Sequence, residues 1–98
     1  TSLDDYLSSE LRQVLKVVYP NPTTDRLVIE HTLPNNQPLL LRVFDINGRQ
    51  LEAIRFNRHE LPEAQLTLDV SRYPEGSYFL NFVFGGKNLG AVKFIKKQ

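Results

Sequence analysis

Histidine, carboxylate and hydroxyl side chains are the groups through which this chain could hold a metal ion or perform catalysis. Neither of the two histidines, His31 and His59, has a second ligand at the short spacings of common zinc sites. A structural or solvated role is favoured for both. The run Asp45-Ile46-Asn47-Gly48 resembles the start of a calcium loop, but the later oxygen ligands and the distal glutamate are absent. We predict no metal site and no cofactor.

The chain contains no cysteine, so no cysteine nucleophile is possible, and serine is the next candidate considered. Ser8, Ser9, Ser71 and Ser77 all lack the Gly-x-Ser-x-Gly context that exposes a nucleophilic serine at a sharp turn. Gly85-Gly86 is not followed by the lysine and hydroxyl residue of a phosphate-binding loop. The carboxylates are scattered over predicted loops and polar faces, so no acid and base pair is visible. We therefore expect a domain that is not an enzyme.

Charge and hydropathy argue against two further classes of partner. The chain has 12 basic and 11 acidic residues and a formal net charge of +1, which gives no field for nucleic acid or an anionic membrane. No apolar run approaches the roughly 18 residues of a membrane span, so we expect a soluble domain. The start of the chain lacks the pattern of a secretory signal. Because it begins at Thr1, we expect a fragment of a longer protein, with any export signal upstream.

One charged cluster stands apart, the five residues Lys93, Phe94, Ile95, Lys96 and Lys97 near the end of the chain. A predicted final strand that ends in basic residues offers a receptor both a sheet edge and an accessible group of cations. The alternative is edge protection, because lysines on an edge strand discourage pairing with another chain. On physical grounds alone, the sequence favours edge protection.

The most informative structural signal is a predicted β-hairpin in residues 39–54, where two apolar-rich runs meet at Asn47-Gly48. This pair predicts a two-residue type I′ turn, which requires positive φ at both positions. The first run is apolar almost throughout and is expected to be a central strand. In the second run, Leu51 and Ala53 share one face and Glu52 lies on the other.

Other alternating runs, separated by proline and glycine, bring the total to about seven short strands. They comprise an edge strand at 17–19, a strand at 26–32 with Leu27 and Ile29 inward, a strand at 65–70 with Leu66, Leu68 and Val70 inward, a mid-sheet strand at 77–84, and a last strand at 89–95. This number and spacing predict an all-β, immunoglobulin-like antiparallel β-sandwich.

Tyr78 follows a turn that contains Pro74 and Gly76 and opens a long inner strand. Immunoglobulin-like sandwiches often place at this point a tyrosine whose hydroxyl bonds to upstream backbone. An ordinary core aromatic residue is an equally good interpretation.

Residues 1–16 differ from the rest of the chain, because leucine and valine recur there at helical spacing. Ser2 and Asp5 have the form of a capping box. A helix over residues 2–16 and an unstructured linker both remain open, since an isolated helix of this length is marginal. We predict a linker or short helix at 1–16 and the β-sandwich at 17–98.

Five segments serve as landmarks along the chain, in the order Val18 to Thr23, Val43 to Arg49, Leu68 to Ser71, Pro74 to Tyr78, and Lys93 to Lys97. Together they resemble the type A carboxyl-terminal sorting domain of the type IX (Por) secretion system. Each landmark is weak alone, but their order and spacing together are specific, and they cover most of the chain.

The resemblance implies an export address that directs an amino-terminal cargo protein across the outer membrane. The expected partners are the outer-membrane secretion machinery and a sortase-like peptidase, which usually removes the domain and can attach the cargo to surface lipopolysaccharide. The cargo would pass through the periplasm to the outer membrane surface or the medium. The residues expected to carry the sorting signal are Lys93, Phe94, Ile95, Lys96 and Lys97.

A competing hypothesis is an immunoglobulin-like binding or adhesion module for a carbohydrate or protein ligand, because this fold hosts many functions. A sugar-binding platform needs exposed aromatic side chains. The chain has no tryptophan, and its tyrosines and phenylalanines lie mostly on predicted inner faces, so the sequence offers little for this hypothesis.

Overall fold

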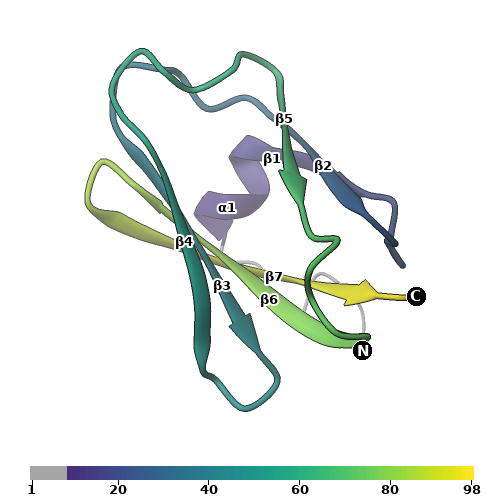
Figure 1. Cartoon of the computed structure of the whole chain (residues 1–98). Coiled ribbons are helices and arrows are strands. Elements are labelled where there is room, and N and C mark those ends of the chain that lie inside the picture. The colour runs from purple at the N-terminus through teal and green to yellow at the C-terminus, as the bar shows by residue number, and fades with distance from the viewer. Residues whose placement is uncertain (1–8) are drawn as a thin grey trace.

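The computed structural model describes residues 9–98, which form a β-sandwich with one short helix (Figure 1). The elements are α1 (Ser9–Val14), β1 (Leu15–Tyr19), β2 (Arg26–His31), β3 (Leu39–Asp45), β4 (Gln50–Phe56), β5 (Gln65–Asp69), β6 (Gly76–Phe84) and β7 (Lys87–Lys96). One sheet has the order β1-β2-β5 and the other the order β4-β3-β6-β7, with every strand pair antiparallel. Among residues 9–98, no helix is long and apolar enough to span a membrane.

The predicted antiparallel sandwich is confirmed, and so are the positions of several strands within it. β1 is an edge strand, and β3 and β6 are the two central strands of the four-stranded sheet. Period-2 alternation identified the inward side chains correctly: Leu27 and Ile29 are fully buried, and Leu66, Leu68 and Val70 are also buried. These side chains meet those of the opposite sheet in one apolar core.

The amino-terminal helix ends at Val14, two residues before the predicted end at Lys16. Leu15 and Lys16 belong to β1, because Leu15 pairs with His31 of β2, and this pairing overrides the helical spacing of the sequence. α1 contacts β7, and Leu11 is fully buried in the core. The docking surface that so short a helix needs is therefore present. The predicted capping box at Ser2 and Asp5 lies outside the described residues.

The predicted type I′ turn at Asn47-Gly48 is wrong. The Gly48 N–H donates to the Asp45 carbonyl (3.0 Å), and of the turn residues only Gly48 has positive φ (84°). This is a three-residue loop, a type I turn followed by a left-handed glycine. Asp45 explains the difference, because its Oδ1 accepts the N–H groups of Asn47 and Arg49, both at 2.9 Å. The two-residue loop with positive φ at both positions occurs instead at Gly85 (58°) and Gly86 (82°), between β6 and β7.

In β4, Leu51 and Ala53 do share a face, but it is the solvent face. Glu52, Ile54 and Phe56 lie on the core side, because the register places them opposite the buried residues of β3. The inward Glu52 carboxylate accepts hydrogen bonds from the Tyr73 hydroxyl and from Nη2 of Arg72 (3.2 Å), which compensates a carboxylate at the rim of the core.

Tyr78 makes the hydrogen bond to upstream backbone that its position in the sandwich indicated. Its side chain is buried, and its hydroxyl donates to the carbonyl of Pro74 at 2.5 Å. The ring also stacks on Phe94 of β7, with centroids 5.5 Å apart. Tyr78 therefore ties the turn before β6 to the last strand of the sheet.

His31 has a structural role. It is buried, its Nδ1 accepts the Leu33 N–H (3.1 Å), and its Nε2 lies 3.0 Å from the Pro62 carbonyl. Only the neutral ring with its proton on Nε2 can accept the Leu33 N–H and also donate to the Pro62 carbonyl. Burial lowers the pKa of His31 below its ordinary value of 6.5, against a smaller opposing effect of the Pro62 carbonyl.

We expect stability to fall on mild acidification because of His31. The unfolded chain takes up a proton near pH 6.5 whereas the folded chain resists it, so stability is complete above that pH and declines as the pH falls toward the lowered folded value. Urea titrations at about pH 7.5 and about pH 5.5 measure this difference. His31→Gln should flatten it, and His59→Asn, which removes the histidine of an exposed loop, is the matched control. An equal pH dependence in His31→Gln would contradict the assignment.

Candidate recognition site at the end of the last strand

The side chains at the end of β7 divide between the two faces of the sheet. Phe94 is fully buried and Lys96 is only 4% exposed, whereas Ile95 is 39% exposed and Lys97 is exposed. Lys93 is half-buried on the same face as Ile95. Of the five residues predicted to carry a signal, the structure leaves Lys93, Ile95 and Lys97 accessible to a partner.

Lys96 corrects an expectation, because an accessible cation was predicted at this position. Two residues after Phe94, Lys96 falls on the core face of the strand, where it pairs with Gly76 of β6. Its aliphatic stem is covered, and its Nζ donates to the Lys97 carbonyl (3.1 Å) at the rim of the sandwich. Lys96 therefore shapes the end of the strand and is a poor candidate for direct recognition.

The outer edge of β7 is covered near its end by the segment that follows β1. The Asn21 side chain accepts the Ile95 N–H at Oδ1 (2.9 Å), and its Nδ2 lies 3.4 Å from the Lys93 carbonyl. Prolines flank Asn21 on both sides, each after a cis peptide bond. A single side chain thus satisfies outward-facing backbone groups on two residues of the edge strand.

Thr23 continues this pairing with its backbone. Its N–H donates to the Ile95 carbonyl (2.8 Å), and its carbonyl accepts the Lys97 N–H (2.7 Å), so that Thr23 and Lys96 form a parallel bridge. The Thr23 side chain is fully buried, and its hydroxyl donates to the Arg26 carbonyl. We call this arrangement of residues 21–23 on residues 93–97 the terminal clasp.

Sequence reasoning included Asn21 and Thr23 only within the landmark Val18 to Thr23 and predicted no contact for either residue. The prolines marked the end of β1 correctly, but nothing local indicates that the segment pairs with residues 72 and 74 positions away in the chain. The clasp changes the interpretation of the lysines, because Asn21 and Thr23 already occupy the edge that the lysines were expected to protect.

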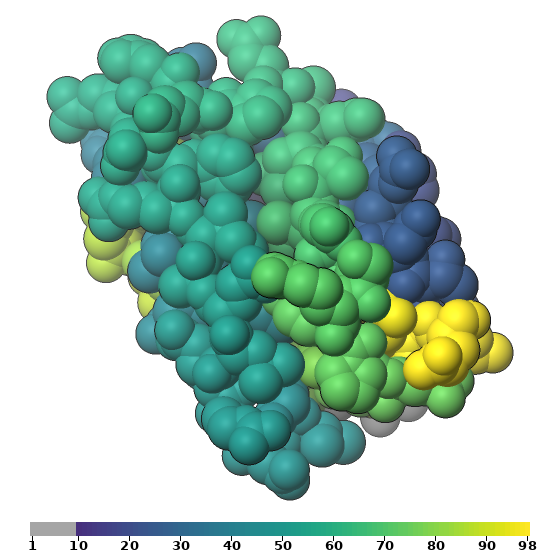
Figure 2. Space-filling model, viewed as in Figure 1, coloured from purple at the N-terminus to yellow at the C-terminus, as the bar shows by residue number. Residues whose placement is uncertain are grey.

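The terminal clasp lies at the surface of the molecule. Figure 2 shows the yellow end of the chain at one corner, between the blue and green segments of the other parts of the sandwich. Lys93, Ile95 and Lys97 point to the side of the strand away from Phe94. The site is therefore a short strand with fixed backbone and two outward cations.

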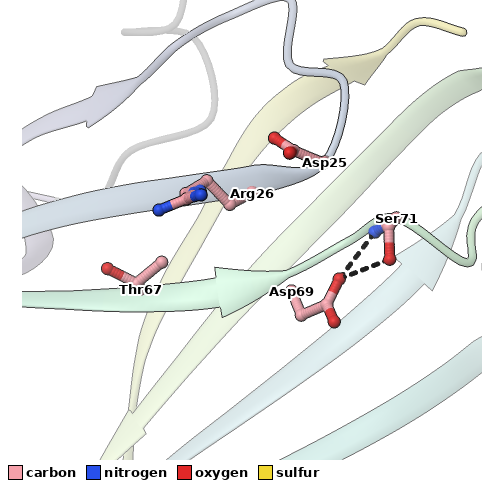
Figure 3. A pocket seen from close by; sticks show the side chains of 5 residues that line it. All are labelled: Asp25, Arg26, Thr67, Asp69 and Ser71. Atoms are coloured by element: carbon pink, nitrogen blue, oxygen red, sulfur yellow. Dashed lines mark hydrogen bonds between the residues drawn. The ribbon is translucent and has the colours of Figure 1, made fainter.

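A separate polar hollow of about 450 Å³ is lined by Asp25, Arg26, Thr67, Asp69 and Ser71 (Figure 3). Oδ1 of Asp69 accepts both the Ser71 hydroxyl (2.6 Å) and the Ser71 N–H (2.9 Å), and these bonds, the hydroxyl first, hold the pKa of Asp69 below its usual value. The five lining residues include no histidine to take a proton from serine. The arrangement is that of a turn stabilised by side chains.

Metal-binding side chains do not cluster in the part of the chain that the structure describes. Residues 9–98 contain no group of three or more His, Cys, Asp or Glu side chains arranged to hold a metal ion. His31 is occupied by two backbone partners, and His59 lies in an exposed loop.

One known protein family matches the chain over most of its length. The family of secretion system C-terminal sorting domains matches residues 17–97. The chain belongs to this family of type IX sorting domains. A crystal structure of a DUF3244-family protein with an immunoglobulin-like β-sandwich fold from Bacteroides vulgatus is similar, with a TM-score of 0.65, 16% identity and 82% of each chain covered. At this identity the likeness shows the fold alone. No curated protein matches the chain.

The fold gives the landmarks of the sorting domain physical roles. The first, Val18 to Thr23, and the last, Lys93 to Lys97, meet in the terminal clasp. Val43 to Arg49 contains the Asp45 turn, and Leu68 to Ser71 contains the Asp69 turn. As a type IX sorting signal, the domain marks an amino-terminal cargo for export by the secretion machinery.

Proposed function

We propose that the sorting domain is recognised at the end of β7, through the outward side chains of Lys93, Ile95 and Lys97 on a strand held by the terminal clasp. The observation that carries this proposal is the set of four contacts from Asn21 and Thr23 to the backbone of residues 93–97. They fix the strand before a receptor arrives, so less conformational entropy is lost on binding.

Charge supports the same surface. The outward cations Lys93 and Lys97 have no carboxylate partner among the described residues, whose ion pairs involve Arg49, Arg72 and Lys87. Cations at the rim of a binding surface speed encounter with an acidic partner and select against basic ones. The exposed Ile95 between them adds an apolar contact.

The proposed route takes cargo from the periplasm through the outer membrane to the cell surface. A sortase-like peptidase then removes the domain and anchors the cargo. A peptidase needs accessible extended backbone, whereas Leu11 is fully buried. Cleavage within α1 would therefore require local unfolding. The domain itself performs no catalysis in this scheme.

The test uses a reporter with its own inner-membrane export signal, fused ahead of this domain in a bacterium that has the type IX machinery. The unaltered fusion should reach the cell surface. Lys93→Ala combined with Lys97→Ala should reduce surface delivery about tenfold and leave the reporter in the periplasm. Lys16→Ala with Arg58→Ala removes the same charge at exposed positions elsewhere and is the matched control.

Circular dichroism and urea unfolding of each variant establish that the domain is folded. Failure of the unaltered fusion to leave the periplasm would refute the sorting role of this chain. Normal delivery of the Lys93 and Lys97 variant would refute the recognition surface while leaving the sorting role intact. Asn21→Ala probes the clasp independently and should lower delivery with little loss of stability, because its side chain is exposed.

A further inference from the structure

The outer face of the four-stranded sheet combines basic side chains with half-buried apolar ones. Strand register defines it: Arg42 of β3 lies opposite Ala53 of β4 and Asn81 of β6. Two residues before Arg42 on the same face of β3, Leu40 lies opposite Arg55 of β4 and Val83 of β6. We call the surface formed by Leu40, Arg42, Arg55 and Val83 the basic sheet face.

All charge on this face has one sign. Arg42 and Arg55 are its charged residues on β3 and β4, while Asp45 and Glu52 alternate to the opposite face of the same strands. Neither arginine belongs to an ion pair of the described residues. The whole chain carries a net charge of only +1, so the excess of positive charge is local to this surface.

Both guanidinium groups are held in place through one nitrogen. Nε of Arg42 donates to Oδ1 of Asn81 (2.9 Å), and the guanidinium lies 5.4 Å from the centre of the Phe44 ring. Nε of Arg55 donates to Oδ1 of Asn57 (2.9 Å). These contacts orient each group and leave the terminal nitrogens to bind an acceptor such as a carboxylate.

A hollow of about 300 Å³ opens beside Arg55 and is lined by Pro38, Leu40, Arg55, Val83 and Gly86. Apart from Arg55, the lining is apolar or glycine. This volume lies at the lower end of the range for ligand pockets and suits one large apolar side chain.

We propose that the basic sheet face binds an acidic protein segment of the secretion machinery, with an apolar side chain in the hollow and carboxylates on Arg42 and Arg55. This inference rests on the proposed sorting function. The two arginines are diagonal neighbours on adjacent strands, where backbone positions typically lie about 7–8 Å apart. Alternate residues of an extended segment are separated by about 6.6–6.8 Å. Acidic residues at alternate positions therefore match the pair.

The burial of the apolar side chains favours a protein segment over a membrane surface. Leu40 and Val83 are half-buried while Arg55 is exposed, so these two apolar side chains are set below the Arg55 cation. A face that enters a lipid bilayer projects its apolar side chains beyond the charged ones. A hollow bounded by a cation instead receives a side chain from the partner.

The direct test measures binding of the whole chain to a labelled synthetic peptide that alternates glutamate with leucine, by fluorescence anisotropy. Arg55→Glu should weaken binding about tenfold, and binding by the unaltered chain should weaken as salt is raised. Arg58→Glu makes the same charge change in the neighbouring exposed loop and should change affinity less than about twofold. Equal affinities for Arg55→Glu and Arg58→Glu would overturn the proposal, as would affinity insensitive to Val83→Asp in a folded variant.

Two further measurements separate the alternatives. Vesicles of phosphatidylglycerol and phosphatidylcholine test the membrane, and Arg55-dependent binding to vesicles without binding to the peptide would overturn the proposal. In the reporter fusion, Arg55→Glu should lower export and Arg58→Glu should not. Export of the unaltered fusion with no effect of Arg55→Glu refutes this inference alone, whereas peptide binding by a chain that is never exported refutes the sorting role alone.

Discussion

Replacing Phe94 with alanine should lower the free energy of unfolding by about 3–5 kcal/mol, the cost usual for removing a buried phenylalanine. Phe94 is fully buried and stacks on Tyr78, whose hydroxyl closes the turn before β6. The loss would combine the burial free energy that the aromatic ring no longer contributes with the cost of a cavity between the sheets. A loss of this size is a large fraction of the stability of a small domain.

Urea unfolding of Phe94→Ala against Ile95→Ala provides the measurement. Ile95 is the next residue of the same strand but is 39% exposed, so its truncation should cost far less. Similar midpoints for the two variants would show that the end of β7 is not part of the core. Lost export in Phe94→Ala would reflect unfolding and would not identify Phe94 as a recognition residue.

Replacing Gly48 with valine should destabilise the domain by about 1–3 kcal/mol. Gly48 has φ of 84°, a left-handed conformation that a β-branched residue strongly disfavours. A Cβ atom at this position would meet nothing within 4 Å, so the cost is backbone strain without a clash.

Gly48→Asn is the informative control, because asparagine tolerates left-handed backbone better than valine does. The midpoint of urea unfolding should be highest for the unaltered chain, lower for the asparagine variant and lowest for the valine variant. An unaltered midpoint for Gly48→Val would mean that the turn after Asp45 relaxes to another shape in solution.

The strands could be predicted because their signal is local. A run such as residues 65–70 alternates with period 2, and burial of its apolar face follows from that alternation alone. The turn at residues 45–48 could not be assigned correctly from its Asn-Gly pair, because the Asp45 side chain accepts two backbone N–H groups and selects a three-residue loop.

The proposed recognition site was predictable only in part. Its location near the end of the chain follows from the family landmarks, but the division of its side chains depends on which face of β7 meets the core. That choice is set by pairing with β6, which places Phe94 opposite Tyr78 and turns Lys96 inward. The clasp depends on contacts between residues more than 70 positions apart, for which a single sequence carries no local signal.

The direction of the Thr23 and Lys96 pairing bears on how the domain responds to mechanical force. The two segments run parallel, so tension applied toward the amino terminus at one end and toward the carboxyl terminus at the other pulls them in opposite directions along their length. The contacts of Asn21 and Thr23 with residues 93–97 then lie across the line of force and share the load, so they must break together. Tension on the two ends of the domain would thus load this set of hydrogen bonds in shear.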